Sequence, residues 1–233
     1  MSHDPLVLTA ELDRATGRLL AGLADLDGAA LAGPSLLPGW SRGHVLSHLA
    51  RNADALGNLL TWARTGVVTP AYASAQAREA GIAAGAGRDL AGQVADLRDS
   101  AGRFAALAAA MPAPAWLVEL DLPGGPAPAA HVMWRRLREV EVHHVDLDLA
   151  YRPAHWPDSF SHRLLHEVAT GLAGVDLTLV ADGVGHRLRV GAGGPPEVSG
   201  DPATLAAWLC GRGTGAGLSV SPAGPLPAVP AWI

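Results

Sequence analysis

Residues 129–150, AAHVMWRRLREVEVHHVDLDLA, are the stretch on which the fold and the chemistry of this chain both depend. On a helical wheel, apolar side chains cover a broad face, and Glu139, His143 and Asp146 form a polar stripe inside it. The other acidic and imidazole groups of the stretch point to different sides of the wheel: Glu141, His144 and Asp148. A buried carboxylate beside a buried imidazole is unfavourable unless the two are paired or bound to a cation. The stretch therefore predicts a long helix that carries either a Glu–His pair or part of a metal site.

A second predicted helix, residues 41–64, offers another inward-facing imidazole. Ser41 is a suitable N-cap, and apolar residues recur after it at helical spacing. His48 lies at the edge of this apolar face, whereas His44 lies farther round toward solvent. Taken alone, His48 fits a hydrogen-bonded core histidine better than a metal ligand.

Together, His48, Glu139 and His143 supply two imidazole nitrogens and one carboxylate. This set suits a divalent metal, zinc above all, and leaves a coordination position open for catalysis. Asp146 is the natural partner for a ligand imidazole, although it could equally anchor the end of its own helix. We therefore expect a metal site at these three residues, with Asp146 beside it.

The rest of the N-terminal part reads as helical, with glycine and proline marking the breaks. Further helices are expected at 5–26, 74–84 and 88–111, and a Pro/Gly-rich loop at 112–128. Five helical segments of this length fit an up-and-down helical bundle.

Beyond residue 155 the pattern changes. A helix at 158–173 precedes residues 176–191, which alternate apolar and polar around Asp182-Gly183, as a β-hairpin does. A short helix at 201–211 and a last strand near 217–221 follow. We therefore expect two domains, a helical bundle over 1–154 and a small α/β domain over 155–233.

Composition excludes several classes of protein. The chain has 233 residues, is 49% hydrophobic and carries a net charge of -5, without the basic run that nucleic-acid binding requires. No apolar stretch approaches the roughly 18 residues of a membrane span, and charged residues come too early for a secretory signal. We therefore expect a cytoplasmic protein. Its single cysteine, Cys210, excludes an internal disulfide and a cysteine-based zinc site, and its apolar surroundings predict a buried thiol.

Three segments make the chain resemble a known family: LLPGWSRGHVLSHLARNADAL, RLREVEVHHVDLDLAY and DPATLAAWLCGRGTG, with LPAVPAW near the end. They are similar to the mycothiol-dependent maleylpyruvate isomerases, and the resemblance covers nearly the whole chain. It implies a DinB-like metal-binding bundle followed by a sterol-carrier-like α+β domain.

The resemblance also implies a reaction, in which a metal-bound mycothiol thiolate adds to a small electrophile, either isomerising the cis double bond of maleylpyruvate or being transferred to the electrophile. The family's metal ligands would fall on His48, Glu139 and His143. Its essential C-terminal arginine would fall on Arg212, which would bind mycothiol or substrate, and Asp146 would assist. From the residues alone, a thiol-independent metal hydrolase and a non-enzymatic metal-binding stress-response module remain alternatives.

Overall fold

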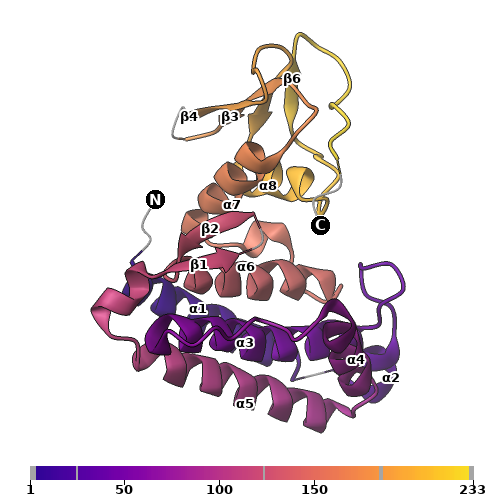
Figure 1. Ribbon diagram of the computed structural model, residues 1–233. Coiled ribbons are helices and arrows are strands. Elements are labelled where there is room, and N and C mark those ends of the chain that lie inside the picture. Colours follow the sequence, from indigo (N-terminus) through magenta and orange to yellow (C-terminus); the bar gives the residue numbers. More distant parts are fainter. Residues whose placement is uncertain (1–3, 25, 123, 184–185, 231–233) are drawn as a thin grey trace. The chain divides into compact units, whose positions relative to one another are not determined.

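The computed structural model describes residues 4–24, 26–122, 124–183 and 186–230. The chain divides into two compact units, Met1–Ala150 and Tyr151–Ile233, which are described separately (Figure 1). None of the helices in the described ranges is both long and apolar enough to cross a membrane.

Four long helices form the core of the N-terminal unit. They are α1 (Pro5–Gly22), α3 (Arg42–Thr65), α5 (Leu90–Ala109) and α6 (His131–Asp146). Helix α1 packs on α6, α6 on α3 and α3 on α5, and a smaller contact between α5 and α1 closes the ring. Two shorter helices complete this part of the unit: α2 (Gly28–Ala32) and α4 (Ala75–Ala86), which both contact α3. The predicted helical bundle is confirmed.

Local sequence explains where these helices begin and end. Asp4, Ser41 and Asp89 are the N-caps of α1, α3 and α5, and each side chain accepts a hydrogen bond from a backbone N–H of the first turn. Such caps satisfy N–H groups that have no partner inside the helix. Helix α3 ends at Gly66, whose φ of 73° is a left-handed conformation that favours glycine.

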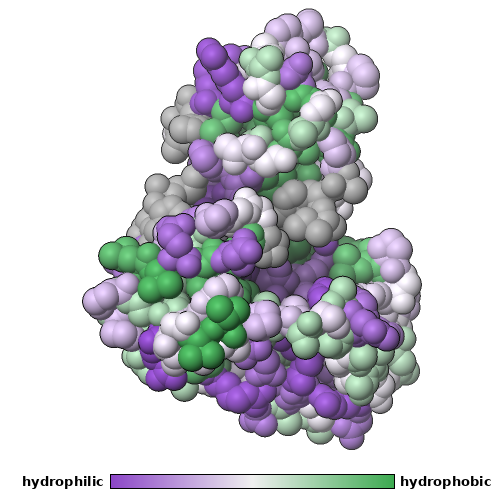
Figure 2. Space-filling view, viewed as in Figure 1, coloured by the Kyte–Doolittle hydropathy of each residue, from purple (hydrophilic) through white to green (hydrophobic). Residues whose placement is uncertain are grey.

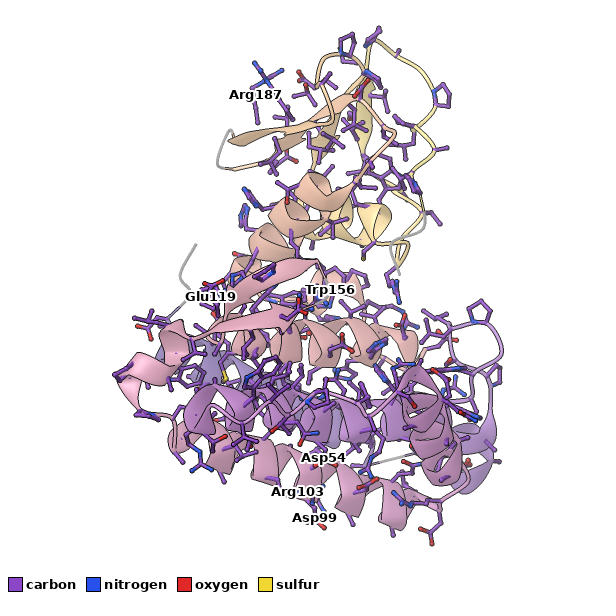
Figure 3. All side chains as sticks on the ribbon, in the orientation of Figure 1. Asp54, Asp99, Arg103, Glu119, Trp156 and Arg187 are labelled. Carbon is purple, nitrogen blue, oxygen red and sulfur yellow. The ribbon has the colours of Figure 1, made fainter. Side chains whose placement is uncertain are left out.

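Helices α3 and α5 share a buried apolar interface and an exposed polar edge. Phe104 of α5 is 2% exposed, whereas Arg103 beside it points outward and makes a bidentate ion pair with Asp54 of α3, at 2.8 and 3.0 Å. The side chains of Asp54, Arg103 and Asp99 lie along this edge in Figure 3, and the surface there is largely hydrophilic in Figure 2. The polar edge explains the amphipathic pattern of α5.

The segment expected as a loop at 112–128 contains regular structure instead. A 3₁₀ helix, η1 (Ala113–Leu117), leads into a hairpin of β1 (Glu119–Leu122) and β2 (Gly125–Pro128). Leu120 and Leu122 alternate inward, at 1% and 4% exposed. The prediction was wrong here because proline is unfavourable inside a sheet but acceptable in an edge strand such as β2.

The C-terminal unit is a small sheet with helices. Its elements are η2 (Pro153–His155), α7 (Asp158–Gly171), β3 (Leu177–Ala181), β4 (His186–Val190), β5 (Glu197–Gly200), α8 (Pro202–Leu209) and β6 (Ser219–Ser221). The strand order is β4-β3-β5-β6, with β3 and β5 parallel and the other pairs antiparallel. Helices α7 and α8 pack on one another, and both contact the sheet. The expected hairpin is β3–β4, and the small α/β domain is confirmed, whereas the sequence did not indicate β5.

Candidate metal centre

His48 is presented by the buried face of α3. Val45, Leu46 and Leu49 on the same face are fully buried, and the His48 side chain is 5% exposed. His44, by contrast, belongs to the helix cap, because its Nδ1 lies 2.7 Å from the Ser41 hydroxyl and accepts from the Ser41 backbone N–H at 3.3 Å. In the first turn of α3, His44 therefore takes part in the helix cap, whereas His48 lies in the interior.

His48, Glu139 and His143 converge between α3 and α6. His48 Nε2 lies 2.9 Å from Glu139 Oε2 and 3.1 Å from His143 Nε2, and His143 Nε2 lies 3.4 Å from the same carboxylate oxygen. All three ligand atoms lie within 4.8 Å of one another. The Glu139 and His143 side chains keep 20% and 15% of their surface exposed, so solvent and small molecules can reach the group. Two imidazoles and one carboxylate with an accessible side form a donor set that fits zinc.

Asp146 fixes the orientation of His143. Its Oδ2 accepts a hydrogen bond from His143 Nδ1 at 2.8 Å, and its side chain is 1% exposed. A carboxylate only accepts, so Nδ1 carries the proton and Nε2 is directed toward His48 and Glu139. This carboxylate–imidazole arrangement is common behind metal-binding histidines. The Asp146 carbonyl also accepts from the Leu36 backbone N–H, which holds the end of α6 in place.

The three candidate ligands shift one another's pKa values. Burial opposes the charge of Glu139, but hydrogen bonds from His143 and His48 outweigh it and hold the Glu139 pKa well below its usual range. Burial also opposes protonation of His143, yet Asp146 and Glu139 raise its pKa to about 9. For His48, burial prevails and lowers the pKa. In the metal-free cluster, Glu139 is therefore a carboxylate and His143 is protonated. A metal cation would replace the positive charge of the protonated His143.

One further residue, Arg78, reaches the cluster from outside the predicted helices of the site, and Tyr72 lies against it. Arg78 of α4 brings Nη2 to 3.4 Å from His48 Nδ1, and its guanidinium lies over the Tyr72 ring, 5.9 Å from the centroid. Both residues line a cavity of about 150 Å³ between α3, α4 and the preceding loop. The Tyr72 hydroxyl is buried, and burial raises its pKa.

Helix α4 can approach α3 this closely because glycines line the contact. A Cβ on Gly43 would lie 2.2 Å from the Ala86 carbonyl oxygen, and one on Gly85 would lie 2.3 Å from the Ser47 hydroxyl. The wheel analysis treated only two helices, so it had no means of placing Arg78 against His48. Glycines at the contact, Gly43 on α3 and Gly85 on α4, are a sequence signal that could have suggested the close approach of the two helices.

The remaining polar residues of α6 lie on another face of the helix. Glu141 is 1% exposed and pairs with Arg18 of α1, and His144 packs against Gly22 of the same helix. The wheel placed both residues away from the candidate ligands, and their neighbours on α1 agree with that placement. They are nevertheless buried.

Arg212 belongs to the C-terminal unit. It follows α8, where its backbone N–H donates to the Ala207 carbonyl at 2.8 Å and its Nη1 donates to the Cys210 carbonyl at 2.8 Å. Cys210 is 1% exposed, as the sequence predicted, and its thiol faces the Ala207 carbonyl.

Comparisons with known proteins point to one family. The family model described as "Mycothiol maleylpyruvate isomerase N-terminal domain" matches residues 12–148. A crystal structure of the mycothiol-dependent maleylpyruvate isomerase is similar over 100% of both chains, with 30% sequence identity and a TM-score of 0.92. A histidine-to-alanine mutant of that isomerase matches equally completely, with 30% identity and a TM-score of 0.91. A search of curated proteins found no match.

The family model covers more than half of the chain, and the similarity to the solved isomerase extends over all of it. The shared features include the helical bundle that holds His48, Glu139 and His143 together and the small α/β domain that follows it. This chain therefore belongs to the mycothiol maleylpyruvate isomerase family.

Proposed function

We propose that this protein is a metal-dependent enzyme that uses mycothiol to isomerise the cis double bond of maleylpyruvate. The observation that carries the proposal is the convergence of His48, Glu139 and His143, within 4.8 Å of one another, in a chain of this family. Mycothiol and maleylpyruvate appear in the name of the solved isomerase, and the full-length similarity to that enzyme supports the same pair of small molecules here.

His48, Glu139 and His143 would hold the metal, and zinc is the ion that their chemistry favours. A bound zinc ion would deprotonate a coordinating thiol at neutral pH, where a free thiol with a pKa of about 8.5 is mostly protonated. Asp146 would keep His143 in the tautomer that presents Nε2 to the metal, since it accepts from Nδ1 at 2.8 Å.

The nucleophile has to come from outside the chain. Cys210 is the only cysteine, and it is 1% exposed with its thiol against a backbone carbonyl. A thiol in that environment is not available to a substrate. A small thiol cosubstrate therefore fits the protein better than a covalent intermediate on the chain itself.

Thiol chemistry explains how the isomerisation proceeds. Reversible addition of a thiolate to the activated double bond turns it into a single bond, about which the substrate rotates. Elimination of the same thiolate then gives the trans isomer, fumarylpyruvate, with no net change in atoms. We assign Arg212 to substrate or cosubstrate binding, because a guanidinium binds a carboxylate through two parallel hydrogen bonds.

The direct test is an isomerase assay on the purified protein, loaded with zinc or stripped of metal, with and without mycothiol. We expect about one zinc per chain, and isomerisation of maleylpyruvate only when metal and thiol are both present. A thermal shift on adding mycothiol to the zinc form, absent from the stripped form, would locate the thiol at the metal. Isomerisation with metal but without thiol would contradict the proposal, and bound metal without any response to mycothiol would favour a hydrolase. A protein that carries no metal would remove the proposed site.

A further inference from the structure

Arg136 is a charged side chain in the interior of the bundle, outside the candidate ligand set. It is 2% exposed and ranks among the largest fully buried side chains of the chain. Burial lowers its pKa to about 10, which still leaves the guanidinium charged at neutral pH. A buried charge is retained only where hydrogen bonds and nearby opposite charge compensate its desolvation.

The compensation comes from α3, across the helix interface. Arg136 Nη1 donates to the Leu49 carbonyl at 2.8 Å and to the Asn52 side-chain oxygen at 2.9 Å. Asn52 is itself 9% exposed. The negative charge of Glu139 also attracts the guanidinium, and it is the interaction that raises the Arg136 pKa most. Arg136 is therefore bonded to α3 and electrostatically attracted to a candidate ligand.

These contacts lie within about one helical turn of the candidate metal ligands on both helices. On α3, Leu49 follows His48 directly, and Asn52 lies four residues after it. On α6, Arg136 lies three residues before Glu139. The contact between His48 Nε2 and Glu139 Oε2, at 2.9 Å, and the contact between Arg136 and Asn52 thus form two successive links between the same helices.

Two links one turn apart define both the axial position and the rotation of α6 relative to α3. A shift of one residue moves a helix by about 1.5 Å along its axis and rotates it by about 100°. Such a displacement would break both links. Apolar packing alone tolerates small slides at modest cost, whereas a bidentate contact to a carbonyl and an amide does not.

We propose that Arg136, bonded to Leu49 and Asn52, is the positioning residue that holds the ligands of α3 and α6 in register. This inference rests on the proposed function insofar as the ligands hold a metal. Arg136 reaches no metal and no substrate itself. It acts by keeping His48 within reach of Glu139 and His143 before a metal arrives, so that binding does not have to order the two helices.

The test measures zinc affinity by competition with a chromogenic chelator, in wild type, Arg136→Met and Asn52→Leu. We expect each substitution to weaken zinc binding by about tenfold or more, the range found for outer residues that orient metal ligands. The double variant should lose less than the product of the two single effects, since both remove the same link. Arg136→Lys should bind zinc with an intermediate affinity, because lysine keeps the positive charge but its shorter side chain reaches less far toward the two acceptors.

Two controls separate positioning from general destabilisation. Arg103→Met breaks the exposed tie between α3 and α5 and should leave zinc affinity unchanged. Phe104→Ala leaves a cavity beside α5 and should lower the Tm of the bundle while leaving the contacts between α3 and α6 in place. The inference would be overturned if Arg136→Met bound zinc within about twofold of the wild-type affinity. It would also be overturned if Phe104→Ala lost as much zinc affinity as Arg136→Met.

A metal-free measurement distinguishes failure of this inference from failure of the proposed function. The imidazole NMR signals of His48 in the stripped protein report its contacts with Glu139 and His143. They should shift in Arg136→Met and stay in place in Arg103→Met. If the wild-type protein bound no zinc, the proposed function would fail while this comparison still decided the role of Arg136. Unchanged signals in both variants would refute the positioning role.

Discussion

Helix α6 carries a glutamate and a nearby histidine on each of two faces, and the two pairs have different partners. On one face, Glu139 and His143 meet a third titratable group, His48, from α3. On the other face, Glu141 meets the guanidinium of Arg18 from α1, and it is almost completely buried at 1% exposed. The same residue types on the same helix thus give a candidate metal centre and an internal ion pair.

The difference between the two faces lies in what the neighbouring helix contributes. Arg18 already supplies a cation to Glu141, so a metal ion would bring no further compensation there. The face toward α3 offers imidazoles, which can give up their protons and accept a metal ion in exchange. A Glu–His pattern on one helix is therefore not diagnostic, because the partner helix decides its chemistry.

The largest effect should come from removing one of the two candidate ligand histidines, His143 or His48. We expect His143→Ala and His48→Ala to lose most of their zinc, with affinity falling by more than the ~100-fold typical of losing an outer partner. His144→Ala, on the α1 face, and His44→Ala, in the helix cap, should retain it. Metal content after dialysis against a weak chelator measures this, and equal retention in all four variants would abolish the distinction between the faces.

A smaller loss is expected from Asp146→Asn. The amide leaves the volume unchanged but can present a donor to His143 Nδ1 in place of the carboxylate acceptor. Zinc affinity should fall by about 10- to 100-fold, while the fold is kept. A competition titration with a chelator dye measures the affinity, and circular dichroism checks the fold. Wild-type affinity in this variant would mean that Asp146 only anchors the end of α6.

The ion-pair face should respond in stability and leave metal binding unchanged. Glu141→Gln removes the charge that Arg18 meets, and we expect the free energy of unfolding to fall by about 2 kcal/mol. Urea unfolding of the metal-free protein measures this, and zinc affinity should be unchanged. Glu139→Gln is the matched variant on the other face, and it should lose zinc affinity. If Glu141→Gln lost zinc as well, the two faces would not be independent.

The smallest effect is a pH dependence of the metal-free protein. The folded pKa of His143, about 9, lies above its unfolded value of about 6.5. Its stabilising contribution is therefore complete below pH 6.5 and lost as the pH rises toward 9. We expect the Tm of the wild type to exceed that of His143→Gln by about 5 °C at pH 6 and by much less at pH 9.5. A difference that stayed constant with pH would show that His143 is not protonated in the metal-free cluster.

Several features of the fold could be predicted from the sequence because they are local. Leucine spacing, N-caps and glycine breaks gave the long helices to within a few residues of their observed bounds. The alternation at 176–191 gave the β3–β4 hairpin. The β1–β2 hairpin was missed because its second strand, Gly-Pro-Ala-Pro, lacks strand-forming residues, and β1 supplies the apolar side chains for both.

For the candidate site, the sequence by itself determined the ligand types and the helical face on which each one lies. It selected His48 over His44 and His143 over His144, since periodicity fixes the direction of a side chain relative to its own helix. It could not determine how the helices meet. Three features join residues 30 or more positions apart: the order of the helices around the bundle, the approach of Arg78 to His48, and the buried link from Arg136 to Asn52. These were decided only in the tertiary structure, because packing and desolvation depend on every neighbour of a side chain, whereas periodicity depends on its own helix alone.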